Sequence, residues 1–213
     1  GQVIGWVQGR AEFGPRALGN RSILADPRPP EHKDIINRMV KKRESYRPFA
    51  PSVLEERIAD YFVVPETQRQ FPYMSVVLQV RPECCSELGA VTHVDETARV
   101  QTVDPVSNPR YWKLIDAFER ETGVPVLLNT SFNNNAEPIV DSVADAIVCF
   151  LTTDLHALVI GDVLVTKRAA PPEQYLGLFL SLPATVLVRS VTTAEADGIT
   201  RTCEVAFSYS GGK

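Results

Sequence analysis

The sequence predicts an α/β fold, and two observations carry the prediction. Short β-prone apolar runs recur along the chain, and segments with helical spacing of apolar residues separate them. At 213 residues, with 44% hydrophobic and 23% charged residues, the chain has the composition of a globular protein and is long enough for one sizeable core. We therefore expect a sheet with helices packed against it.

The composition also excludes several classes of protein. No run of eighteen apolar residues and no signal-peptide pattern is present, so we expect neither membrane insertion nor secretion, and a cytoplasmic location. The four cysteines include an adjacent pair but no CxxC motif, and the three histidines lie far apart. The sequence therefore predicts reduced thiols and no metal site.

The first segment joins a strand to a loop with unusual chemistry. Residues 2–7 are apolar and β-prone, and they begin without a methionine, as expected at the edge of an excised domain. Residues 9–22 then place three arginines (Arg10, Arg16 and Arg21) among three glycines. Arginine forks suit carboxylate and phosphate oxygens, and glycines let the backbone approach a ligand. The stretch is therefore typical of an oxyanion-binding loop, with solvated structural arginines as the alternative.

The next segment concentrates cations at a helix end. Residues 31–43 have apolar residues at helical spacing, and Pro48 and Pro51 then impose an extended segment. Lysines and arginines between residues 41 and 47 fall at the junction. They either stabilise the helix C-terminus or bind an anion.

The middle of the chain predicts a short helix and two strands. The helix covers residues 55–62, and residues 71–80 form a strand apolar enough to be buried on both faces. Residues 97–103 alternate between two faces. Arg99 on this strand is either solvated or a donor aimed into a groove.

From residue 108 onward the pattern alternates between helix and strand again. A helix begins at Asn108 and stops at Gly123, a short strand covers residues 124–128, and a helix follows at residues 142–151. Residues 129–138 form a polar loop whose amides and hydroxyls, Asn129 among them, either bind a nucleotide and its phosphates or satisfy their own backbone. Residues 157–165 predict two strands around a Gly-Asp turn, and residues 184–193 and 199–209 are β-prone without a recognisable motif.

Charge is distributed unevenly along the chain. Residues 1–48 carry ten Lys or Arg against five Asp or Glu, whereas residues 49–213 carry twelve against twenty-one. A local basic region in an acidic protein predicts a small phosphorylated ligand and argues against nucleic acid. The P-loop, dinucleotide and nucleophile-elbow motifs are absent. What remains suits electrostatic catalysis on a phosphate or adenylate.

Four blocks of the sequence resemble the C-terminal domain of the NodU/CmcH-type O-carbamoyltransferases, which act on nodulation factors and antibiotics. The blocks are residues 9–24, 41–51, 93–101 and 128–133. The resemblance covers about residues 1–168 and implies a YrdC-like fold, a twisted mixed open sheet with flanking helices. Residues 169–213 lie outside it as a β-rich extension of unknown role.

The resemblance also implies an activity and a site. Such a domain converts carbamoyl phosphate and ATP, with Mg²⁺ but no tightly bound metal, into carbamoyl adenylate for a separate N-terminal acceptor domain. Its KxR…SxN signature corresponds here to Lys41, Arg43, Ser131 and Asn133, with further arginines at Arg16, Arg47 and Arg99. We expect Lys41, Arg43 and Arg16 to be catalytic, and Arg47, Arg99, Ser131, Asn133 and Asn129 to bind substrate or nucleotide.

Two positions depart from the family pattern, which has glycine where this chain has Glu96 and Ala136. Glu96 places a carboxylate beside Arg99 in the sequence, where it either weakens nucleotide binding or pairs with an arginine. Two other functions stay open: synthesis of threonylcarbamoyl adenylate, and a non-catalytic module that binds nucleotide or RNA or docks a partner domain. The resemblance to the carbamoyltransferases favours carbamoyl-adenylate formation.

Overall fold

The computed structural model describes residues 1–41, 48–134, 137–167, 186–188 and 205–207. Its strands are β1 (Ile4–Val7), β2 (Arg21–Ala25), β3 (Ala50–Leu54), β4 (Val76–Gln79), β5 (Thr97–Val103), β6 (Val126–Ser131), β7 (Ala157–Ile160), β8 (Val163–Thr166), β9 (Val186–Val188) and β10 (Val205–Phe207). Its helices are α1 (Glu31–Ile36), η1 (Asn37–Lys41), η2 (Glu55–Arg57), α2 (Ile58–Tyr61), η3 (Pro82–Cys84), α3 (Pro109–Thr122) and α4 (Val143–Thr152).

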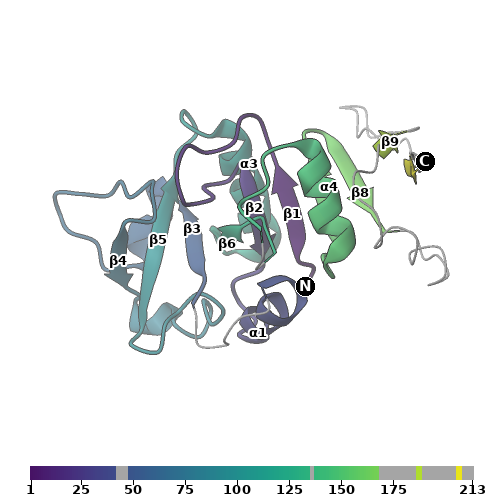
Figure 1. Ribbon diagram of the computed structural model, residues 1–213. Coiled ribbons are helices and arrows are strands. Elements are labelled where there is room, and N and C mark those ends of the chain that lie inside the picture. Colours follow the sequence, from purple (N-terminus) through teal and green to yellow (C-terminus); the bar gives the residue numbers. More distant parts are fainter. Residues whose placement is uncertain (42–47, 135–136, 168–185, 189–204, 208–213) are drawn as a thin grey trace.

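Eight strands form one open sheet in the order β4-β5-β3-β6-β2-β1-β7-β8, which Figure 1 shows from one edge to the other. The pairs β1–β7 and β3–β5 are parallel, and the other neighbouring pairs are antiparallel. The predicted α/β fold with a mixed open sheet and flanking helices is confirmed.

Each face of the sheet carries its own apolar core. Strand side chains alternate between faces, so Trp6 and Leu24 pack with α3 while Val7 and Ile23 pack with the core that contains α4. Helix α4 lies across β1 and β7 (Figure 1). The inner strands therefore need apolar residues on both faces.

The two long helices begin where the sequence places their caps. The Asn108 side chain accepts a hydrogen bond from the Tyr111 N–H, and Gly123 ends α3 in the left-handed conformation with φ +80°. Ser142 and Asp145 form a reciprocal capping box at the start of α4. The two strands around the Gly161 turn are also confirmed, with Gly161 at φ +58°.

Two predicted elements differ from the structure. The helix predicted for residues 31–43 is α-helical only to Ile36 and continues as the π-helical turn η1. The strand predicted for residues 71–80 is limited to β4, and it is not buried on both faces: β4 is an edge strand with Val77 54% exposed. Its apolar sequence is that of an inner strand, but the sheet gives it one neighbour, and Met74 at φ +53° interrupts the extended backbone before it.

Strand β9 pairs antiparallel with β10, as the two β-prone runs near the end of the sequence suggest. Among the helices that the structure describes, none is long and apolar enough to cross a membrane.

Candidate functional site

The glycine- and arginine-rich loop is held by side chains that satisfy its backbone. The Glu12 carboxylate accepts hydrogen bonds from the N–H groups of Leu18 (2.6 Å) and Asn20 (2.8 Å). The Trp6 indole N–H donates to the Gly19 carbonyl (2.9 Å). These contacts are buried or half-buried. They hold the segment after Arg16 in one conformation, although it has no regular secondary structure.

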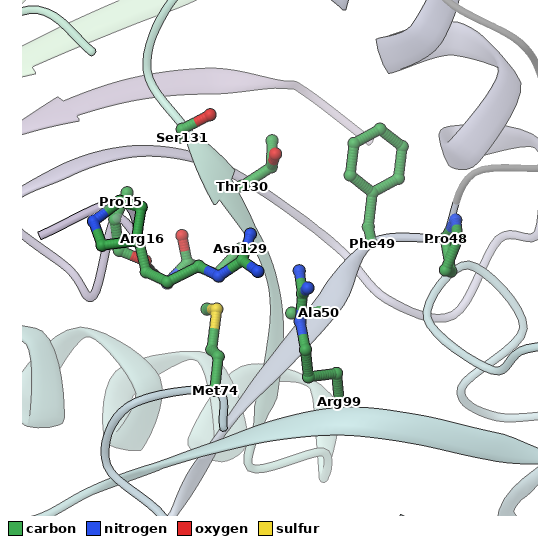
Figure 2. A pocket seen from close by; sticks show the side chains of 11 residues that line it. Pro15, Arg16, Pro48, Phe49, Ala50, Met74, Arg99, Asn129, Thr130 and Ser131 are labelled. Carbon is green, nitrogen blue, oxygen red and sulfur yellow. Dashed lines mark hydrogen bonds between the residues drawn. The ribbon is translucent and has the colours of Figure 1, made fainter. Parts of the chain in front are cut away.

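Arg16 from this loop and Arg99 from β5 face the same cavity. The cavity has a volume of about 90 Å³, and Figure 2 shows the two guanidinium groups reaching into it from different elements. The rest of its wall is formed by Pro15, Ala17, Pro48, Phe49, Ala50, Met74, Asn129, Thr130 and Ser131. Two segments far apart in the sequence therefore converge on one small, cation-lined space.

Arg99 is half-buried, and its buried Nε atom has no hydrogen-bond partner among the residues that the structure describes. Burial, and secondarily the charge of Arg16, lowers the pKa of the Arg99 guanidinium below its ordinary value. Within the described part of the chain, no carboxylate forms an ion pair with either arginine. Of the two alternatives for Arg99, the one in which its side chain faces a groove agrees with its place in the cavity wall.

A second, larger cavity of about 480 Å³ adjoins the first, and Pro15 and Ser131 line both. Asn133 and Asp141 contribute polar groups to its wall, and Ile139 contributes apolar surface. The Ser131 hydroxyl donates to the Asn133 side-chain oxygen at 2.8 Å, and the Asn133 amide donates to the Glu137 carbonyl at 2.8 Å. Ser131 thus lies at the junction of the two cavities, and Asn133, to which it is hydrogen-bonded, lines the larger one.

Asn129 is in a different position from the one predicted. The polar loop was expected to begin at residue 129, but β6 continues through Ser131, because residues 128–131 pair with β2. Asn129 is therefore a strand residue only 1% exposed. Its amide nitrogen lies within hydrogen-bonding distance of the Ala17 carbonyl (3.2 Å), the Ser52 hydroxyl (3.1 Å) and the Gln101 side-chain oxygen (3.0 Å). It lines the cavity but also supports the arginine loop.

The other predicted cations are only partly described. Lys41 is the last residue of η1, and its side chain lies outside the described part of the chain, as do Arg43 and Arg47. Pro48 and Phe49, which follow them directly, line the small cavity. The residues that directly follow the predicted cations therefore lie at the cavity wall.

Arg21 and Glu96 have separate roles. Arg21 is 6% exposed, and its guanidinium donates to the carbonyls of Gln8, Gly9, Asn20 and Asp141, so it is one of the structural arginines considered as the alternative.

Glu96 is exposed, and among the described residues it forms no ion pair with Arg99. Of the alternatives left open for Glu96, pairing with Arg99 does not occur among the described residues.

Four residues at or beneath the site were not singled out in the sequence. Met74 and Phe49 are buried wall residues whose apolar character gives no local sign of a site. Ser52 and Gln101 are buried polar residues in strands β3 and β5. The signal that could have found these two is the presence of a polar side chain in the middle of a strand that is otherwise apolar.

The chain is similar to known proteins of one family. The model of the family described as carbamoyltransferase C-terminus matches residues 1–167. The chain is 64% identical over 183 residues to the nodulation protein NolNO of Sinorhizobium fredii, covering 86% of this chain and 27% of that protein. It is 58% identical over 211 residues to the nodulation protein NolO of Bradyrhizobium diazoefficiens, covering 99% of this chain and 38% of the relative.

A third relative has a name that states a reaction. The 3'-hydroxymethylcephem-O-carbamoyltransferase of Amycolatopsis lactamdurans is 43% identical over 162 residues, which cover 76% of this chain and 30% of that protein. The chain thus spans well under half the length of each of these relatives. The family match extends over both segments that supply arginines to the small cavity. The chain therefore belongs to the family of carbamoyltransferase C-terminal domains.

Proposed function

We propose that this domain forms carbamoyl adenylate from carbamoyl phosphate and ATP, and supplies it to an acceptor domain that carbamoylates a hydroxyl group. The observation that supports the proposal most directly is the cavity between Arg16 and Arg99, where two cations face each other with no carboxylate pairing either in the described structure. The name of the cephem relative, an O-carbamoyltransferase, supports the reaction class.

The two adjoining cavities suit the two ends of the substrates. The smaller one, with Arg16 and Arg99, would hold the carbamoyl and phosphate groups, and the larger one would hold the nucleoside. The α-phosphorus of ATP, which the carbamate attacks, would lie beside Ser131 and Asn133. Lys41, Arg43 and Arg47 would add positive charge from the segment before Pro48.

The chemistry requires charge stabilisation more than a base. Water cleaves carbamoyl phosphate to carbamate and phosphate, and a carbamate oxygen then attacks the α-phosphorus of ATP. The bond from that phosphorus to the bridging oxygen breaks, and pyrophosphate leaves with the electron pair. Attack of one anion on another is accelerated when fixed cations hold both in line and offset the growing charge. An ionised carbamate needs no general base.

Mg²⁺ would enter with the nucleotide. No group of three or more His, Cys, Asp or Glu side chains suited to a metal ion occurs among the residues that the structure describes. Mg²⁺ commonly binds through substrate phosphates with few protein ligands, and it would here neutralise the charge of the departing pyrophosphate.

A pyrophosphate-release assay tests the proposal. With carbamoyl phosphate, ATP and Mg²⁺, we expect the native chain to release pyrophosphate only when carbamoyl phosphate is present. Arg16→Ala and Arg99→Ala should each lower the rate by about 10²-fold, the order of loss for one electrostatic donor in a water-poor site. Lys41→Ala should abolish release.

Arg120→Ala is the matched control, because Arg120 is an exposed cation on α3 whose partner is Asp116 and which does not line either cavity. It should retain the native rate. A folded native chain that binds ATP without releasing pyrophosphate would favour the non-catalytic module. Release that depends on bicarbonate and threonine would favour threonylcarbamoyl-adenylate synthesis.

A further inference from the structure

Three buried polar side chains lie beneath the arginine loop on neighbouring strands. Ser52 of β3 is directly opposite Gln101 of β5, and Asn129 of β6 is opposite Ala50, two residues before Ser52 on the same face. Ser52, Gln101 and Asn129 are 0%, 4% and 1% exposed. They belong to the sheet face covered by α3, and the loop covers this part of it.

Their hydrogen bonds lead from the sheet to the loop. The Ser52 hydroxyl donates to the Gln101 side-chain oxygen at 2.6 Å, which leaves the Gln101 amide nitrogen to donate to the Leu18 carbonyl at 2.8 Å. The Asn129 amide nitrogen is within reach of the Ala17 carbonyl. Because a carbonyl can only accept, these contacts fix the orientation of both amides.

The two carbonyls held in this way are those immediately after Arg16. Arg16 is itself exposed, and Arg99 is a positive group that faces it across the cavity. Repulsion between two guanidinium groups in a partly dehydrated space would move the more mobile one away. Arg99 lies on β5, which has a neighbouring strand on each side, so the loop that contains Arg16 is the part that would move.

We propose that Gln101, which contacts Asn129 directly and through Ser52, is a positioning residue that holds the backbone after Arg16 so that Arg16 and Arg99 bind one oxyanion together. The inference rests on the oxyanion site of the proposed function. Gln101 does not line the cavity, so its effect on a ligand passes through the loop. Asn129 acts in the same way in addition to any contact it makes with ligand.

The polar identity of the three residues supports this role over a purely structural one. Apolar side chains of similar volume would pack the three strands together at least as well, because a buried polar group costs free energy unless it is fully hydrogen-bonded. What apolar side chains could not do is bind the carbonyls of Ala17 and Leu18. The loop would then have two buried acceptors without partners and would shift toward solvent.

A double-mutant cycle with inorganic pyrophosphate as the probe tests the inference. Isothermal titration at low ionic strength gives the affinity of the full chain and its Gln101→Met, Arg16→Ala and combined variants. Methionine matches glutamine in length but has no donor. We expect Gln101→Met to lower pyrophosphate affinity about tenfold in the native background and less than twofold when Arg16 is already Ala, because the two residues then act on the same interaction.

Controls separate positioning from general destabilisation. Thr153→Val removes another buried hydrogen bond, from the Thr153 hydroxyl to the Cys149 carbonyl at the end of α4, and should leave pyrophosphate affinity unchanged. Amide hydrogen exchange of residues 12–22 should be faster in Gln101→Met than in Thr153→Val. If Gln101→Met does not fold, Ser52→Ala is the second variant, because it removes the Ser52 hydrogen bonds and leaves the direct contact of Asn129 with Gln101. It should give a smaller loss of pyrophosphate affinity with the same dependence on Arg16.

The outcomes separate this inference from the proposed reaction. The positioning role is overturned if Gln101→Met does not lower pyrophosphate affinity. It is also overturned if the loss of affinity is the same whether residue 16 is Arg or Ala. Pyrophosphate binding that depends on Gln101, without pyrophosphate release from ATP, contradicts the reaction and leaves the positioning role standing. A native chain that does not bind pyrophosphate overturns both.

Discussion

Glu96 carries backbone strain in an exposed position. Its φ is +61°, in the left-handed region that side chains with a Cβ seldom adopt. The side chain is exposed, whereas the backbone N–H and carbonyl are used: the N–H donates to the His93 carbonyl, and the carbonyl accepts from the Val80 N–H. These two hydrogen bonds hold the backbone of Glu96 in the strained conformation.

Glu96→Gly should therefore stabilise the fold. Relief of the left-handed strain, of order 1–2 kcal/mol, exceeds the entropy that glycine adds to the unfolded chain, so we expect a net gain of roughly 0.5–1 kcal/mol. The urea midpoint of unfolding measures it. Glu87→Gly is the control, because Glu87 is also exposed but has no positive φ, and it should be neutral or destabilising.

At the scale of elements, the arginine loop depends on α3 for its shape. Gly19 has φ +107°, and a Cβ placed there would lie 2.2 Å from the Tyr111 ring on α3. Tyr111 is fully buried, so moving its ring aside would cost packing free energy. Burial also raises the pKa of its hydroxyl above the ordinary value. The helix and the loop thus fit together only when residue 19 has no side chain.

Gly19→Ala should consequently destabilise the protein by at least about 3 kcal/mol, the sum of a steric clash and left-handed strain. Gly123→Ala provides the comparison, because Gly123 also has a positive φ, but a Cβ added there would meet open space within 4 Å. Strain alone should cost that variant about 1 kcal/mol. Equal losses in the two variants, measured by urea unfolding, would contradict the packing role of Tyr111.

For the whole molecule, several carboxylates make stability depend on acid pH. Hydrogen bonds from Ser107 lower the pKa of Asp104, and hydrogen bonds from Ser142 lower that of Asp145. Burial alone would raise the pKa of Asp26, but its bonds and ion pair with Arg28 outweigh burial and lower it. A carboxyl with a lowered folded-state pKa stabilises the fold above its unfolded value of about 4, and the contribution is lost as the pH falls through the folded value.

We therefore expect the urea midpoint to decrease below about pH 4. A separate decrease should begin near pH 6.5, the ordinary histidine value, because burial lowers the pKa of His93 in the folded state. Asp145→Asn, which cannot ionise, should lower the midpoint near neutral pH and make its decrease in acid smaller. A midpoint that rises on acidification would show that the opposite sign holds, with carboxylates destabilised in the folded state.

The sequence by itself determined the local features of this protein. Helix starts at Asn108 and Ser142 and the stop at Gly123 follow from contacts between residues a few positions apart, and the alternation of residues 97–103 identified β5. The arginine loop was found for the same reason, because its arginines and glycines are adjacent in the chain. The resemblance to the carbamoyltransferases rested on such blocks too.

Only the tertiary structure decided which residues meet. The edge position of β4, the direction of Arg99 toward Arg16, and the contact of Gln101 with the loop all depend on strand order and register between segments separated by tens of residues. Asn129 belonged to a loop by its composition and to a strand by its pairing with β2. Periodicity gives the face of a strand on which a side chain lies, but long-range pairing alone gives what that face contacts.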